Sequence, residues 1–137
     1  MYANAYIFFE GNCAEALKFY EKTLGAHVEM STTYGESPAA AHVPPALHDK
    51  VIHARLMLGN TAILASDCPP DKSAGKPGGY SLTLSVDSPE TAEKVFAALT
   101  DGGRVTMAMN KTFFAEKFGQ GVDRFGIPWM VICDKAL

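Results

Sequence analysis

"YIFFEGNCAEALKFYEKTL" spans residues 6–24, and "SLTLSVDSPETAEKVFAAL" spans residues 81–99, a shift of 75 positions. Each stretch begins with a short apolar run, reaches an Asx residue and then takes on a helical spacing of apolar side chains. Asn12 and Asp87 are the predicted N-caps, each with a glutamate three positions later as its capping-box partner. The shared order indicates an internal duplication.

The apolar faces of the two predicted helices match as well. Both follow the i, i+3, i+7 spacing of a helix that lies on a sheet, and glycine follows each helix as a stop signal. The matched positions are Leu17, Tyr20 and Leu24 in the first helix and Ala92, Val95 and Leu99 in the second.

Three strand-like segments follow each predicted helix. In the first half they are residues 27–34, 50–59 and 61–67, and in the second half residues 104–111, 116–123 and 127–134. Gly59-Asn60 predicts a short hairpin turn, and the glycine-rich segment 116–123 is the weakest strand signal. Each half is therefore predicted to be a βαβββ module of the α+β class.

A single domain, residues 1–137, is expected to contain module one (1–67), an exposed linker (68–79) rich in Pro, Gly and Lys, and module two (80–137). A second irregular stretch, residues 35–48, lies inside module one and is long enough to be a functional loop.

Composition excludes several classes of function. Hydrophobic residues make up 47% of the 137 positions and charged residues 20%, which is typical of a globular domain rather than a disordered or membrane chain. The net charge of −3, without a basic stripe, argues against nucleic-acid binding. Three cysteines without metal spacing and a start without a basic signal region favour a cytoplasmic protein that lacks disulfides.

Three stretches carry a family resemblance: "YIFFEGNCAEALKFY" at the start, "KVIHARLMLGNTAILASD" in the middle and "DRFGIPWMV" near the end. With paired βαβββ modules, they resemble the PhnB-like branch of the vicinal-oxygen-chelate superfamily, which includes glyoxalase I, bleomycin-resistance proteins and extradiol dioxygenases. The resemblance covers essentially the whole chain. It implies that the mixed sheets form an open cup with the helices outside, and that the protein is a homodimer.

Metal-dependent members of that superfamily bind a divalent ion with His, Glu or Gln from the first and last strand of each module. The resemblance carries these positions to Ala5, Ile63, Tyr80 and Met130, and a slip of one residue would substitute Tyr6 or Ser81. Because Mg²⁺, Mn²⁺ and Fe²⁺ require oxygen and imidazole donors, no metal or other cofactor is expected.

The segment "KVIHARLMLG" presents a mixed face once its side chains alternate. Ile52, Ala54, Leu56 and Leu58 form an aliphatic face suited to a helix, whereas His53, Arg55 and Met57 share the opposite face with Val51. His and Arg suit an anionic or oxygen-rich ligand, and Met suits an apolar or aromatic one. The alternative is that Arg55 pairs with a neighbouring carboxylate and His53 is a satisfied polar residue.

His42, His48 and His53 lack metal-ligand spacing, so the first two are interpreted as solvated loop residues. Cys133, on a predicted buried strand without a base, is not expected to be a nucleophile.

The favoured hypothesis is a metal-free, small-molecule-binding protein whose ligand contacts His53, Arg55, Met57, Tyr80 and Met130. One alternative is an enzyme of lyase, transferase or dioxygenase type that uses His53 as its catalytic residue or holds a displaced divalent metal. Another is a structural or interaction module whose dimer surface is the function.

Overall fold

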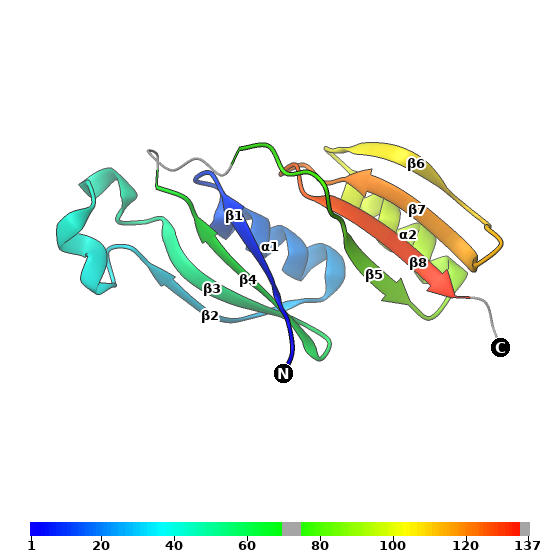
Figure 1. The fold of residues 1–137 in the computed structure, drawn as a ribbon, viewed down its shortest axis with the longest axis horizontal. Coiled ribbons are helices and arrows are strands. Elements are labelled where there is room, and N and C mark those ends of the chain that lie inside the picture. The colour runs from blue at the N-terminus through cyan, green and yellow to red at the C-terminus, as the bar shows by residue number, and fades with distance from the viewer. Residues whose placement is uncertain (70–74, 135–137) are drawn as a thin grey trace. The chain divides into compact units, whose positions relative to one another are not determined.

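The computed structural model describes residues 1–69 and 75–134. The chain divides between Gly75 and Lys76 into two compact units, each of which contains four strands and one α-helix (Figure 1). Part of the predicted linker, residues 70–74, lies outside the described residues. Among those that are described, no helix is long and apolar enough to cross a membrane.

The first unit follows the predicted order of one strand, one helix and three strands. These elements are β1 (Ala5–Phe9), α1 (Cys13–Leu24), β2 (His27–Thr33), β3 (Val51–Leu58) and β4 (Thr61–Asp67). Their sheet has the order β1-β4-β3-β2, with β1 parallel to β4 and the other pairs antiparallel. The irregular stretch between β2 and β3 contains two short 3-10 helices, Pro38–His42 and Pro45–Leu47.

The second unit repeats this topology. Its elements are β5 (Leu82–Val86), α2 (Pro89–Thr100), β6 (Arg104–Asn110), β7 (Ala115–Val122) and β8 (Pro128–Asp134), and its sheet order is β5-β8-β7-β6. Again the first strand is parallel to the last, and the other pairs are antiparallel. Two βαβββ modules of the α+β class are therefore confirmed. The open cup concerns how the two units face each other and stays a prediction.

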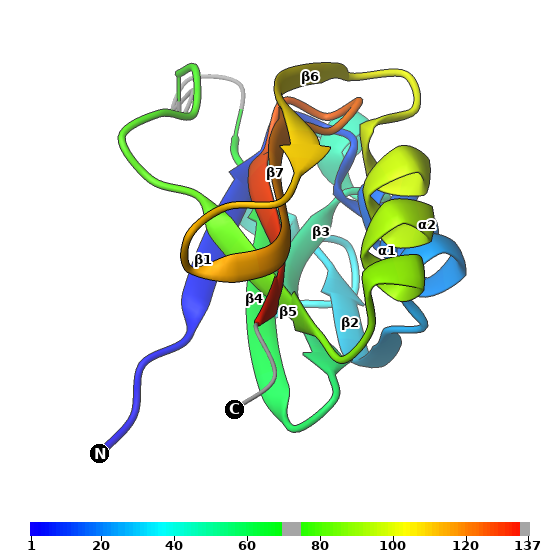
Figure 2. The ribbon, with the colours of Figure 1, turned by 90° about the vertical axis from the view of Figure 1, so that its right-hand side faces the viewer.

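Each helix covers one face of the sheet in its own unit, as Figure 2 shows for α2. The two helices begin 76 residues apart, at Cys13 and Pro89, so the predicted shift of 75 is wrong by one. Phe96, rather than Val95, consequently occupies the core position that corresponds to Tyr20. The first strands, β1 and β5, begin 77 residues apart, and one fewer residue separates β5 from α2 than β1 from α1, which gives the helices their offset of 76.

The predicted N-caps are also partly wrong. Ser88, not Asp87, caps α2, and its hydroxyl accepts a hydrogen bond from the Thr91 backbone N–H at 3.1 Å. Asn12 occupies the N-cap position of α1 but makes no side-chain capping bond. Asp67 supplies that acceptor from the end of β4, through a contact that no local pattern could reveal.

Asp67 is a buried carboxylate that joins three parts of the first unit. Its Oδ1 accepts from the backbone N–H groups of Gly11 and Cys13, both at 2.9 Å, and its Oδ2 accepts from that of Val51 at 3.0 Å. The Tyr34 hydroxyl donates to the Asp67 carbonyl at 2.8 Å. These bonds fix the entrance to α1 and the start of β3 against the end of β4.

Asp123 has the matching role in the second unit, inside the turn that precedes β8. Its Oδ1 accepts from the backbone N–H groups of Phe125 and Ile127, and its Oδ2 accepts from Trp129 Nε1 at 2.8 Å. Trp129 itself is 1% exposed. The "DRFGIPW" stretch therefore encodes a turn that its own first residue closes.

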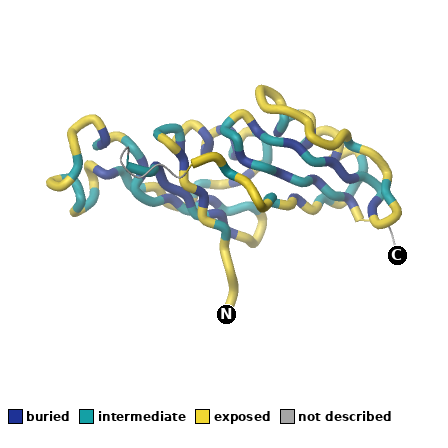
Figure 3. Tube along the Cα trace, turned by 45° about the horizontal axis from the view of Figure 1, so that its top comes forward, coloured by how far each residue is buried: buried dark blue, intermediate teal, exposed yellow. Residues whose placement is uncertain are grey.

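The weak strand signal at 116–123 has a steric explanation. A Cβ at Gly121 would lie 2.5 Å from Thr100 Cγ2, and one at Gly119 would lie 3.1 Å from the Phe96 ring. Glycine at these positions lets α2 approach β7 closely. Buried and half-buried residues alternate along β8, whereas β6 is exposed along most of its length (Figure 3).

Replacing Asp67 with alanine should leave three backbone N–H donors, two buried and one part-buried, without acceptors. We expect the free energy of unfolding to fall by about 3 kcal/mol or more, measured by urea titration. Asp49→Ala, at an exposed loop carboxylate, is the matched control and should change it by less than about 0.5 kcal/mol. Equal stabilities for Asp67→Ala and Asp49→Ala would show that Asp67 has no anchoring role.

The Cys13 thiol gives the fold a dependence on alkaline pH. Burial, and secondarily the charge of Asp67, raises the pKa of Cys13 from 9.0 to about 12. Between these values the unfolded chain releases this proton while the folded chain retains it, so stability should fall as pH rises from 9 towards 12. Urea midpoints across this range should fall less steeply in Cys13→Ala. A pH dependence in Cys13→Ala as steep as that of the wild type would contradict this assignment.

Candidate functional site

The face of the first sheet that lies opposite α1 gathers the candidate residues. Ala54 and Leu56 of β3 are fully buried on the helix side, whereas His53, Arg55 and Met57 are half-buried on the other side. We call this second side the open face. The predicted sorting of the β3 side chains fits the burial pattern from His53 to Met57, whereas Val51, assigned to the mixed face, is 2% exposed.

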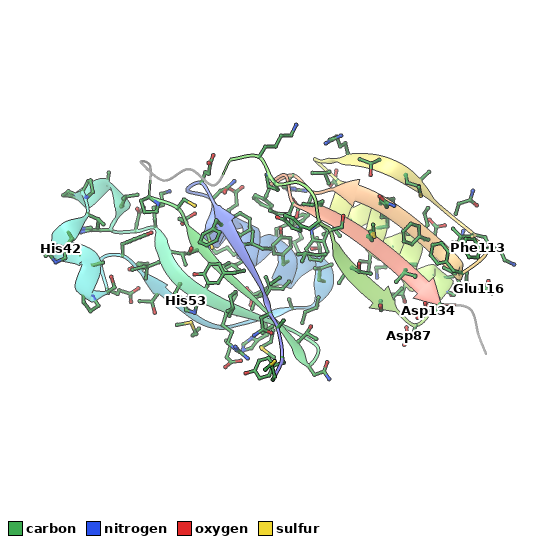
Figure 4. The ribbon with its side chains drawn as sticks, in the orientation of Figure 1. His42, His53, Asp87, Phe113, Glu116 and Asp134 are labelled. Carbon is green, nitrogen blue, oxygen red and sulfur yellow. The ribbon has the colours of Figure 1, made fainter. Side chains whose placement is uncertain are left out.

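Strand β1 adds two aromatic rings to the open face. Ile7 and Phe9 are buried against the helix, so their neighbours Tyr6 and Phe8 point the other way, and these are 38% and 52% exposed. The Tyr6 and Phe8 rings stack with centroids 4.8 Å apart. The Tyr6 hydroxyl lies 3.0 Å from His53 Nδ1, within hydrogen-bond distance. Figure 4 shows His53 on β3, between β2 and β4.

Arg55 holds the cationic position of the open face. Its register partners are Leu64 on β4 and Met30 on β2, and Tyr6 lies beyond Leu64. Its Nε is 3.5 Å from Glu29 Oε2 in an ion pair whose two side chains are 34% and 53% exposed. Such an exposed pair contributes little stability, so an anionic ligand can compete with Glu29. Both partners that the alternative interpretation required are present, Tyr6 for His53 and Glu29 for Arg55.

The two candidates in the second unit are placed differently. Met130 is half-buried on β8, between the buried residues Trp129 and Val131, and therefore on the face of its sheet that is away from α2. It pairs with Thr83 on β5 and Gln120 on β7. Tyr80 precedes β5 and is 49% exposed. A shared ligand for these two residues and the open face of the first sheet stays a prediction.

The assigned metal positions are partly out of register. Ala5 pairs with Ile63, and Ile63 pairs with Leu56, so Ala5 and Ile63 lie on the helix-covered face. The residues facing away from the helices on the first and last strands are instead Tyr6 with Leu64, and Thr83 with Met130. A phenol, a hydroxyl, an alkyl group and a thioether do not match the imidazole and carboxylate donors that such an ion needs, so these residues do not fit the superfamily's metal.

The remaining candidate groups do not form a site. His42 is exposed on its 3-10 helix, and His48 Nε2 lies 3.0 Å from the Ala40 carbonyl. Across residues 1–69 and 75–134, no group of three His, Cys, Asp or Glu side chains is close enough to hold a metal ion. Cys133 is buried, and burial, with the charges of Glu116, Asp134 and others, raises its pKa, which opposes thiolate chemistry.

Sequence reasoning missed Tyr6 and Phe8 as members of the open face. The signal was available, because "AYIFF" is apolar at every position and a strand divides such a run between two faces. Tyr6 entered only as a possible slip in the metal alignment. Its hydrogen bond to His53 spans 47 residues of sequence and depends on β4 lying between β1 and β3.

Comparison with known proteins places this geometry in a family. The profile of the Glyoxalase/Bleomycin resistance protein/Dioxygenase superfamily matches residues 3–131. The chain is 32% identical to Protein YjdN of Escherichia coli over 134 residues, which cover 92% of this chain and 90% of that protein.

Solved structures agree. The crystal structure of protein PA1353 from Pseudomonas aeruginosa has a TM-score of 0.90 and 40% identity, and the alignment covers 99% of each chain. A Bacillus cereus PhnB protein, described as a putative 3-demethylubiquinone-9 3-methyltransferase, shares the fold with a TM-score of 0.81 at 23% identity, over 97% of this chain and 99% of that one. The repeated βαβββ topology and the match over residues 3–131 lead to one conclusion: the chain belongs to the Glyoxalase/Bleomycin resistance protein/Dioxygenase superfamily.

Proposed function

We propose that this protein binds a small molecule, without the superfamily's metal, and that the molecule combines an aromatic or apolar body with an anionic or oxygen-rich group. His53, Arg55 and Met57 contact it on the open face of the first sheet, and Tyr80 and Met130 contribute from the second unit. Tyr6 and Phe8 extend the proposed ligand set.

One observation carries this proposal: exposed aromatic rings and a cation share the open face. Tyr6 and Phe8 leave a third to a half of their surface exposed, which core packing alone would not favour. Their stacked rings offer a flat apolar surface. Arg55 lies on β3, two strands away from β1, and its guanidinium can donate two hydrogen bonds to an anionic group. A ligand with an aromatic body and an anionic group matches both features.

Anilinonaphthalene sulfonate has this chemistry and is a direct probe. We expect one saturable site in a fluorescence titration of the native protein. Arg55→Gln should weaken binding about fivefold, since a partly exposed charge contact is worth about 1 kcal/mol. Glu29→Gln should tighten it, because Arg55 is then released from its ion pair.

The matched control is Lys22→Gln, which removes one positive charge from the last turn of α1 and should leave the affinity unchanged. Binding that weakens equally in Lys22→Gln and Arg55→Gln would reflect net charge alone and would contradict the proposed contact. Absence of saturable binding in the wild type would contradict it as well.

Acid–base catalysis at His53 is a second candidate. It is favoured by the Tyr6 hydroxyl, which engages Nδ1 and so leaves Nε2 as the ring nitrogen for a substrate proton. Turnover of a bound compound that stops in His53→Gln while binding persists would distinguish this candidate from binding alone.

We also propose that the protein is a homodimer, as the superfamily resemblance implies. The supporting observation is the edge strand β6, where Val105 and Met107 are about half exposed, followed by Phe113 at 90% exposure. Light scattering at micromolar concentration should give twice the chain mass of 14.7 kDa. A monomer under these conditions would contradict the proposal.

We also propose that the protein is located in the cytoplasm. It is supported by Cys13, Cys68 and Cys133, none of which forms a disulfide, as is usual where the environment is reducing. Recovery of the protein from a secreted fraction would contradict it.

A further inference from the structure

A pocket of about 640 Å³ lies within the second unit. Residues 76–81 border it together with the start of β6, the end of β7 and the start of β8. Its volume is within the range of sites that hold small organic molecules. Tyr80 is the only member of the proposed ligand set among its lining residues.

Positive charge dominates the lining of this pocket. Lys76, Arg104 and Arg124 line it, and Asp123 is the only carboxylate among the lining residues. Asp123 is 2% exposed, and its two oxygens accept three hydrogen bonds inside the turn before β8. It is therefore committed to the turn and does not offset the cations that face a ligand.

The three cations differ in how far they are already engaged. Arg124 donates from Nε and Nη2 to the Asp101 carbonyl, at 3.2 and 3.1 Å, and its Nη2 is 3.6 Å from Asp101 Oδ2. By contrast, Lys76 and Arg104 are exposed, and within the described ranges, 1–69 and 75–134, neither has a carboxylate at ion-pair distance. Two cationic side chains are thus available at one pocket.

Neutral polar groups complete the lining. Gln120 contributes a half-buried amide from β7, and Thr106 and Ser81 contribute hydroxyls. Amides and hydroxyls donate hydrogen bonds to oxyanions, and a guanidinium binds phosphate or carboxylate oxygens in a bidentate manner. This combination favours an anion over a cation or a purely apolar ligand.

We infer that this pocket is a binding site for a small organic anion that carries a phosphate or carboxylate group, with Arg104 and Lys76 as its principal contacts. The site goes beyond the proposed function, because its charges come from β6 and from residues 76–81 rather than from the open face of the first sheet. Tyr80 is common to both ligand sets, so the test uses residues that belong to one set only.

Isothermal titration calorimetry at low ionic strength tests this site. Inorganic pyrophosphate and citrate are titrated separately, which distinguishes binding of a phosphate group from binding of a carboxylate group. At least one probe should bind saturably at one site per chain. Arg104→Gln should weaken it about tenfold, the loss expected for one charge-assisted hydrogen bond, and Lys76→Gln should weaken it to a smaller extent. Added salt should weaken it further, because the site is exposed.

Lys94→Gln is the matched control, since it removes one exposed positive charge from α2 in the same unit but outside the pocket. His53→Ala should also leave binding of both probes unchanged, so that failure of this site and failure of the open-face proposal are distinguishable. Lack of saturable binding for both probes, or an equal loss in Lys94→Gln and Arg104→Gln, would overturn the inference.

Discussion

One helix can cover only one face of a four-stranded sheet, and this constraint governs each unit. In the first unit, Ala16, Leu17 and Tyr20 of α1 are buried on the face formed by Ala54 and Leu56. The strand side chains that alternate with Ala54 and Leu56, such as His53 and Arg55, therefore lie on the other face of the sheet. A purely structural module would be expected to place polar side chains there, as antiparallel sheets with one solvated face commonly do.

The open face departs from that expectation. Tyr6, Phe8 and Met30 are large apolar side chains with more than a third of their surface exposed, and they share a face with His53 and Arg55. Because these residues project from paired strands rather than from loops, their relative positions are fixed by backbone hydrogen bonds. Binding on such a prearranged surface costs less conformational entropy than binding that must first order a loop.

Two buried carboxylates keep the strand ends in place. Asp67 bonds to backbone groups more than 50 residues away at the entrance to α1, and to Val51 at the start of the strand that carries His53. Asp123 closes the turn into β8, which carries Met130. Each unit thus places one satisfied carboxylate beside a strand with candidate ligand contacts. Asp67 and Asp123 are not proposed to contact a ligand, because their carboxylate oxygens already accept hydrogen bonds within the fold.

The fold was largely predictable because its signals are local. Strand alternation, helical spacing, Gly59-Asn60 and the duplicated pattern predicted the right elements in the right order, and the alternation along β3 fits the burial of residues 53–57. What failed depended on distant contacts or on a shift of one residue. Ser88 replaced Asp87 as the cap of α2, and Ala5 and Ile63 proved to face the helix, because a slip of one position reverses the face of a strand residue.

The site was less predictable for the same reason. The pairing of Tyr6 with His53 requires the strand order β1-β4-β3, and the partner of Arg55 is on β2, across a strand pair with an irregular register. The pocket near Arg104 combines residues 76–81 with three strand ends, and no spacing in the sequence relates them.

We propose that the open face of the first sheet is a ligand-binding surface. The most direct test is nuclear magnetic resonance of the isotope-labelled protein, in which backbone amide shifts are followed during titration with anilinonaphthalene sulfonate. If the open face binds this probe, the largest shifts will occur at Tyr6, Phe8 and the β3 residues His53, Arg55 and Met57. Shifts confined to α1, or to the strand ends around Arg104 in the second unit, would contradict it.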